Sequence, residues 1–154
     1  DYGKALADDA DYAGKAARIS ELALDISAVI DAEPLADCLA RDADGQSIAF
    51  HSPCTLQHGQ GITGVVERLL QSAGYVLQPV TDSHLCCGSA GTYSILQPEL
   101  SAQLRDNKLG ALQAGEPAAI ATANIGCLAH MSGHAEVPVR HWIELLEPLL
   151  PEAR

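Results

Sequence analysis

Two adjacent cysteines followed by a glycine, Cys86-Cys87-Gly88, constrain this chain more than any other short stretch. Neighbouring residues place their Cα atoms about 3.8 Å apart, which is shorter than the roughly 4.4–6.8 Å that a disulfide prefers. The two thiols are therefore expected to find partners elsewhere in the chain. Cys54 lies upstream and Cys127 downstream, each in a segment punctuated by glycine or proline. The sequence predicts that the fold brings these thiols together.

Composition and charge limit the classes of protein to which this chain can belong. With 154 residues, 47% of them hydrophobic, the chain can bury a real core. A net charge of −11 without any cluster of Lys and Arg argues against nucleic acid as a partner. Five cysteines, two of them adjacent, do not resemble a secreted disulfide framework, so a reducing compartment and metal or redox chemistry are expected.

Targeting signals are not evident in the sequence. No segment shows the basic and then apolar pattern of a signal peptide. No apolar run reaches the roughly 18 residues of a membrane span. The chain begins without an initiator Met, and we expect it to be part of a longer protein.

Hydrophobic periodicity predicts strands that alternate with helices. The predicted helices cover residues 5–30, 61–73, 98–113 and 141–150. The predicted strands cover residues 47–51, 75–80, 118–123 and 137–140. This alternation predicts an α/β fold, with a mostly parallel sheet of about four strands and flanking helices, preceded by an N-terminal helical segment. We therefore divide the chain into an N-terminal helix and linker, residues 1–46, and a cysteine-rich α/β domain, residues 47–154.

Each of the cysteines in the glycine- or proline-rich segments follows a predicted strand. The loops that follow parallel strands gather at one edge of an open sheet, where ligands usually bind. Thiolates are soft ligands that select zinc, copper(I) and iron–sulfur clusters. The candidate ligands of a metal or iron–sulfur centre are therefore Cys54, Cys86, Cys87 and Cys127. Glycines beside them allow backbone amides to approach cluster sulfurs, which raises a reduction potential.

Histidines near the cysteines divide into one candidate ligand and several structural residues. The spacing Cys127-x-x-His130 lets one segment reach a metal twice, so His130 is a fifth candidate ligand. The histidines beside the other cysteines are interpreted as solvent-facing or hydrogen-bonded loop residues: His51, His58 and His84. His134 and His141 are interpreted as structural, and Cys38, which has no glycine or histidine neighbour, is interpreted as a packing residue.

The cysteine spacing resembles that of the cysteine-rich CCG domain. The resemblance rests on the spacing of the cysteines: 31 residues separate Cys54 from the pair Cys86-Cys87, and 39 residues separate that pair from Cys127. CCG domains occur in the cysteine-rich subunit of heterodisulfide reductase and in the iron–sulfur subunits of glycolate oxidase and lactate-utilisation systems. Further stretches are similar to the glycolate oxidase iron–sulfur subunit, namely residues 51–60, 86–93, 123–127 and 139–144. The resemblance covers essentially the whole chain and implies the C-terminal half of such a subunit.

The resemblance implies an electron-transfer domain of a glycolate oxidase-like complex. A partner flavoprotein subunit with FAD would oxidise glycolate to glyoxylate, and an iron–sulfur cluster of the [4Fe–4S] type would pass electrons towards quinone. The implied partners are the flavoprotein subunits and the upstream half of this chain, in the cytoplasm, with peripheral attachment to the inner face of the membrane through the complex. The isolated domain is expected to have no glycolate-oxidising activity, because the flavin lies elsewhere.

Two departures from the family pattern leave alternatives open. His130 stands where the family has its last cysteine, and Ser52 stands where relatives often have Asp. The site could then hold a cluster with nitrogen ligation, a single metal ion such as zinc, or no metal. The alternative function is a non-catalytic assembly module that docks the flavoprotein subunits. A third interpretation is thiol–disulfide catalysis at Cys86-Cys87.

Overall fold

The chain consists of two compact units, Asp1–Pro34 and Leu35–Arg154. The computed structural model describes residues 2–152, and inside this range only the side-chain surroundings of Ala36 are left out. Residues 35–46 belong with the second unit. Backbone hydrogen bonds explain this, because Ala40 N donates to Leu149 O at 2.8 Å and Ala43 N donates to Ala73 O at 2.9 Å.

The first unit contains short helices, not the single helix predicted over residues 5–30. They are α1 (Tyr2–Ala5), α2 (Ala13–Leu22) and α3 (Ile26–Asp31). Aspartates interrupt the helix, since Asp9 Oδ1 accepts from Asp11 N and Tyr12 N, each at 2.9 Å. Asp25 caps α3 by accepting from Ser27 N at 2.9 Å. These side chains offer the backbone local hydrogen bonds that compete with a continuous helix, so the single-helix prediction is wrong.

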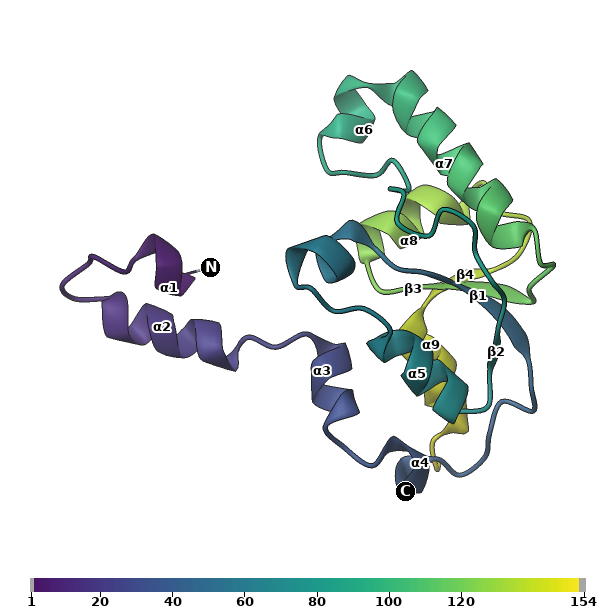
Figure 1. Ribbon diagram of the computed structural model, residues 1–154, viewed down its shortest axis with the longest axis horizontal. Coiled ribbons are helices and arrows are strands. Elements are labelled where there is room, and N and C mark those ends of the chain that lie inside the picture. Colours follow the sequence, from purple (N-terminus) through teal and green to yellow (C-terminus); the bar gives the residue numbers. More distant parts are fainter. Residues whose placement is uncertain (1, 153–154) are drawn as a thin grey trace. The chain divides into compact units, whose positions relative to one another are not determined.

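The second unit confirms the predicted α/β class. Its sheet has four parallel strands in the order β2-β1-β3-β4 (Figure 1). The strands are β1 (Ser47–His51), β2 (Val76–Leu77), β3 (Ala119–Thr122) and β4 (Val139–His141). Every residue of β3 is buried, as is typical of a parallel sheet covered on both faces.

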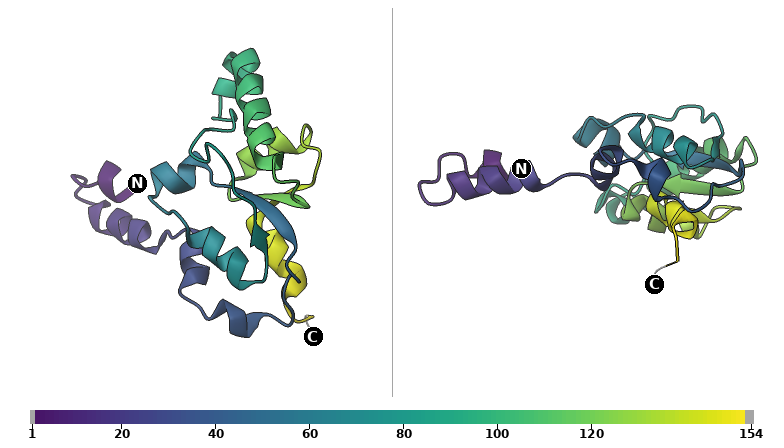
Figure 2. Two further views of the ribbon diagram at one scale, coloured as in Figure 1. Left: turned by 45° about the vertical axis from the view of Figure 1, so that its right-hand side comes forward. Right: turned by 90° about the horizontal axis from the view of Figure 1, so that it is seen from below.

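Helices cover both faces of this sheet. On one face lie α5 (Val65–Ser72) and α9 (Trp142–Leu146) (Figures 1 and 2). A 3₁₀ turn, Glu147–Leu149, follows α9 directly. On the other face lie α7 (Pro98–Gln113) and α8 (Ile125–Ser132). Helix α7 has the bounds that the sequence predicts. Three further elements have no counterpart among the predicted ones: α8, α6 (Tyr93–Leu96) and a π-helical turn at Thr55–Gly59. The short α4 (Leu35–Cys38) was expected only as a turn at Cys38. No helix within residues 2–152 is both long and apolar enough to cross a membrane.

The strand order creates a crevice at one edge of the sheet. From β1 the chain crosses to β2 on one side, and it later returns to form β3 on the other side of β1. The carboxyl ends of β1 and β3 are neighbours, with His51 paired to Thr122 in the register. In open α/β sheets, ligands bind where the strand order reverses in this way. The fold therefore places its candidate site at the end of β1 and β3.

Candidate metal centre

The structure brings the four candidate cysteines to this crevice. Cys54 follows β1 after Ser52 and Pro53. Cys86 and Cys87 lie in the loop before α6, and Cys127 lies in the first turn of α8. All four line one cavity of about 300 Å³. The expected loop around Cys127 is a helix instead, which Asn124 begins by accepting from Gly126 N at 2.9 Å and Cys127 N at 3.2 Å.

The thiols interact with one another in pairs. The Cys127 thiol donates a hydrogen bond to Cys87 and lowers the pKa of Cys87 to about 6, with further help from the Ser89 backbone amide. The same hydrogen bond, with burial, raises the pKa of Cys127. Burial raises the pKa of Cys86, whose thiol contacts Cys54 and accepts from Gly88 N at 3.3 Å. The hydrogen bond therefore favours the thiolate form of Cys87 and the thiol form of Cys127.

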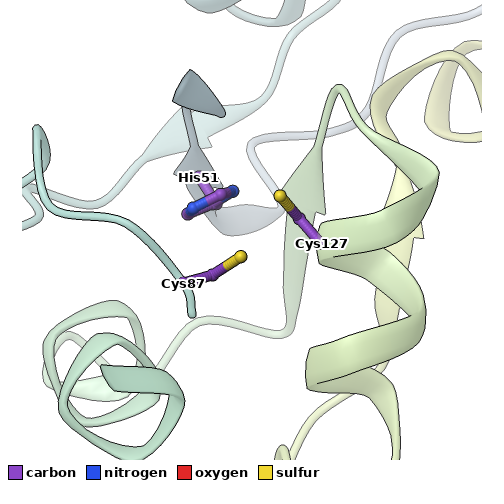
Figure 3. Close-up of side chains that lie close together, drawn as sticks. All are labelled: His51, Cys87 and Cys127. Atoms are coloured by element: carbon purple, nitrogen blue, oxygen red, sulfur yellow. The ribbon is translucent and has the colours of Figure 1, made fainter. Parts of the chain in front are cut away.

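His51 joins this group, although the sequence analysis interpreted it as a loop residue. It is the last residue of β1 and is only 2% exposed. A ring nitrogen of His51 and the Sγ atoms of Cys87 and Cys127 all lie within 4.8 Å of one another (Figure 3). The signal for this placement was in the sequence, because His51 ends an apolar run that was itself predicted as a buried strand. The loop interpretation of His51 is wrong.

His130, the fifth candidate ligand, contacts the cysteine loop through another residue. Its Nε2 lies 3.2 Å from the Ser101 hydroxyl, and that hydroxyl donates to Gly88 O at 2.8 Å. Ser101 is fully buried on α7 and holds the Cys-Cys-Gly loop against that helix. His130 is not among the donors that cluster with Cys87 and Cys127 in the described part of the chain.

The remaining histidines and the fifth cysteine lie outside this group. His58, His84 and His134 are exposed, and exposure agrees with the solvent-facing interpretation of His58 and His84. His141 caps α9 by accepting from Ile143 N at 3.4 Å, which confirms its structural role. Cys38 is exposed, so its interpretation as a packing residue is wrong.

A buried lysine that was not predicted from the sequence supports the cysteine loop. Lys108 on α7 is 2% exposed, and its Nζ donates to Asp82 O at 2.7 Å and to Ser83 O at 3.3 Å. Burial lowers the pKa of Lys108, while the nearby acidic Asp82 and cysteine thiols act in the opposite direction. Its ammonium group offsets negative charge on the thiols. No pattern in the sequence distinguishes this lysine from the exposed cations.

Gly88 allows the loop to approach α7 closely. Its φ is +88°, and a Cβ at this position would overlap the backbone oxygen of Ser101. A second link joins the Cys54 segment to α8, since Asn124 Nδ2 donates to Thr55 Oγ1 at 3.3 Å. The loops that carry the thiols are therefore held by hydrogen bonds and close packing.

The stability of the metal-free domain should depend on pH through His51. Burial, with a smaller effect of the Lys108 charge, lowers the pKa of His51 from 6.5 to about 4. Between these two values the unfolded chain binds a proton at His51 and the folded domain does not. The free energy of unfolding should therefore fall as pH drops from 6.5 to 4, by up to about 3 kcal/mol. Urea unfolding measured at several pH values between 6.5 and 4 should show this decrease in the free energy of unfolding for the wild type and a smaller decrease for His51→Gln. If the free energy of unfolding fell equally with pH in both proteins, the role of His51 would be contradicted.

Comparison with known proteins agrees with the cysteine spacing. The family model for the cysteine-rich domain called CCG matches residues 48–132. The chain belongs to the CCG family. The glycolate oxidase iron-sulfur subunit of Escherichia coli K12 is 51% identical to this CCG chain over 150 residues, which are 97% of the chain and 36% of that subunit.

More distant relatives match smaller shares of the chain. The probable glycolate oxidase iron-sulfur subunit of Bacillus subtilis 168 is 30% identical over 132 residues, 85% of this chain and 30% of that protein. Lactate utilization protein A of Geobacillus kaustophilus HTA426 is 31% identical over 104 residues, 64% of this chain and 44% of that protein. The chain thus spans less than half the length of these relatives.

Proposed function

We propose that this CCG domain holds an iron–sulfur centre and transfers electrons within a complex that oxidises glycolate. The observation that carries the proposal is the convergence of four thiols on one cavity at the carboxyl ends of parallel strands. Such a set of soft ligands suits iron–sulfur clusters and zinc, and disfavours magnesium or calcium. The names of the iron-sulfur relatives support the same chemistry.

The residues around the cavity fit such a group. Cys54, Cys86, Cys87 and Cys127 would hold it, and His130 could join them only by leaving Ser101. The amide of Gly88 already donates to a cysteine sulfur, and Lys108 supplies a buried positive charge nearby. Both features stabilise added negative charge, which raises a reduction potential. When bound, a [4Fe–4S]-type cluster would supply one-electron transfer at this site.

The rest of the proposed pathway lies in other subunits. A flavoprotein partner with FAD would remove hydride from glycolate to give glyoxylate, and this domain would pass the electrons onward to quinone. We place the complex in the cytoplasm, attached peripherally to the inner face of the membrane. The upstream part of the parent chain would be the second partner of this domain. The domain alone is expected not to oxidise glycolate.

Anaerobic reconstitution tests the proposal directly. The protein is incubated with ferrous iron and sulfide, desalted, and analysed for iron, acid-labile sulfide, visible absorbance and the EPR signal after dithionite reduction. We expect a brown protein with iron and sulfide in comparable amounts. Colourless protein that binds about one zinc ion would overturn the electron-transfer role.

That second outcome corresponds to an alternative function, a non-catalytic module that docks flavoprotein subunits. One observation favours it: His51, Cys87 and Cys127 offer three buried donors within 4.8 Å of one another, enough for a single metal ion. Metal and sulfide analysis of the same sample separates the two functions.

A further inference from the structure

We propose that His51 is the nitrogen ligand of this metal centre, bound through Nε2, and that Thr122 positions its ring for that role. This role rests on the proposed function, because it requires a metal at the cysteine cavity. It adds to the thiols a ligand that lies outside the cysteine spacing of the CCG pattern.

The position of His51 in the fold favours a ligand. It ends β1, where the strand order reverses and the sheet opens towards the cysteine loops. Its side chain is 2% exposed, so solvent does not satisfy its ring. Cys87 and Cys127, which are also buried, contribute the neighbouring sulfur atoms (Figure 3).

The two ring nitrogens of His51 have different surroundings. Nδ1 lies 3.0 Å from Thr122 Oγ1, on the paired residue of β3. Nε2 is buried without a hydrogen-bond partner; in residues 2–152 the only other such side-chain atom is Nε1 of Trp142. An unpaired buried polar atom costs about 1–3 kcal/mol and calls for an explanation. Indole Nε1 carries a hydrogen and cannot ligate a metal, whereas imidazole Nε2 can.

The contact with Thr122 is compatible with the tautomer of His51 that binds metal through Nε2. If Nδ1–H donates to Thr122 Oγ1, the lone pair of Nε2 is free. Metal-binding histidines nearly always donate their other N–H to an oxygen in this way. The hydrogen bond also fixes the ring plane, which prepares Nε2 for one direction of approach.

The distances between donors suit a shared metal. Bonds of about 2.3 Å to sulfur and about 2.0–2.1 Å to nitrogen place the ligands of a tetrahedral metal about 3.5–3.8 Å apart. One ring nitrogen of His51 and the Sγ atoms of Cys87 and Cys127 meet this requirement to within about an ångström, since none is more than 4.8 Å from another. Small side-chain movements would therefore complete the contacts.

His130 is the competing nitrogen ligand, and its contacts favour another role. The single hydroxyl hydrogen of Ser101 is used on Gly88 O at 2.8 Å. The contact of His130 Nε2 with that hydroxyl, at 3.2 Å, then requires Nε2–H to donate. His130 thus supports the Cys-Cys-Gly loop through Ser101. A neutral imidazole at His51 would add a ligand without adding negative charge, so the reduction potential of the centre would stay higher than with a further thiolate.

The wild-type protein loaded with Co²⁺ provides the first test. A cobalt-bound histidine gives a strongly shifted, solvent-exchangeable N–H resonance in the proton NMR spectrum. We expect one such resonance, from Nδ1–H, exchanging slowly because that nitrogen is buried against Thr122. Thr122→Val should speed its exchange while leaving Co²⁺ bound. Absence of any shifted histidine resonance in the wild type would overturn the proposal.

Matched variants provide the second test. His51→Gln should weaken Co²⁺ binding at least about tenfold and remove the shifted resonance. His130→Gln should retain both the resonance and the affinity within about threefold. Circular dichroism of the metal-free variants checks that each is folded. Persistence of the resonance in His51→Gln, or its loss in His130→Gln, would overturn the assignment to His51.

The two proposals fail in different ways. If the wild type binds Co²⁺ with the shifted resonance but takes up no sulfide with iron, the electron-transfer role fails and the role of His51 stands. If an iron–sulfur cluster forms, nitrogen couplings in pulsed EPR of protein labelled with ¹⁵N-histidine must be present in the wild type and absent in His51→Gln. A cluster without them overturns the role of His51 alone.

Discussion

Gly88→Ala should destabilise the second unit by about 2–6 kcal/mol and abolish incorporation of iron. The added Cβ would overlap the backbone oxygen of Ser101 on α7, and neither backbone can move freely. A φ of +88° adds a strain of about 1–3 kcal/mol for a residue with a side chain. Overpacking contributes another 1–3 kcal/mol or so. Urea unfolding of the metal-free protein and iron content after reconstitution measure the two effects.

Gly91→Ala is the matched control for this change. Gly91 lies in the same loop and also has positive φ, at +59°, but a Cβ there would meet no atom within 4 Å. We expect a loss of only about 1 kcal/mol and normal iron content. If the two variants were destabilised equally, close packing on α7 would not be the reason for a glycine at residue 88.

Cys127→Ala should lower iron incorporation at least about tenfold. The Cys127 thiol is both a candidate ligand and the hydrogen-bond donor that lowers the pKa of Cys87. Its removal therefore takes away one sulfur and makes the thiolate at Cys87 less available at neutral pH. The estimate is a lower bound, because even the residues that only orient a ligand typically contribute tenfold or more to metal affinity. Iron and sulfide analysis after anaerobic reconstitution gives the measurement.

Cys38→Ala controls for the general loss of a thiol. Cys38 is exposed and does not line the cavity. This variant should incorporate as much iron as the wild type. A comparable loss in Cys38→Ala would show that iron binds to thiols non-specifically and would remove the support for a defined centre.

One strand and one long helix could be predicted with their exact bounds because their signals are local, whereas the strand predicted over residues 75–80 is only Val76–Leu77. Residues 47–51 form a strand with the predicted bounds, since a short apolar run between Gly45 and Pro53 specifies a buried strand. Pro98 and Gly115 likewise mark the ends of α7. From the order of these elements the parallel sheet followed, and with it the gathering of the cysteines at one edge.

Other features of the candidate site depend on contacts between residues that are distant in the sequence, so local sequence signals could not predict them. Ser101 holds both Gly88 and His130, and nothing in the spacing Cys127-x-x-His130 reveals that contact. The unpaired Nε2 of His51 is a property of its three-dimensional surroundings. Helix α8 had a local signal, the capping residue Asn124, but Gly126 two residues later favoured a loop. The histidine that lies beside Cys87 and Cys127 is therefore not the one that the spacing suggests.

The strand order also determines when the cysteines can come together during synthesis on the ribosome. Strand β1 emerges early, yet its neighbour β3, and Cys127 behind it, follow only after α7 has been made. Until then the thiols of Cys54, Cys86 and Cys87 have no finished cavity to enter, and oxidants or stray metals can reach them. Delivery of a cofactor must wait for this late pairing, so the nascent chain is most vulnerable in the interval when α7 is being translated.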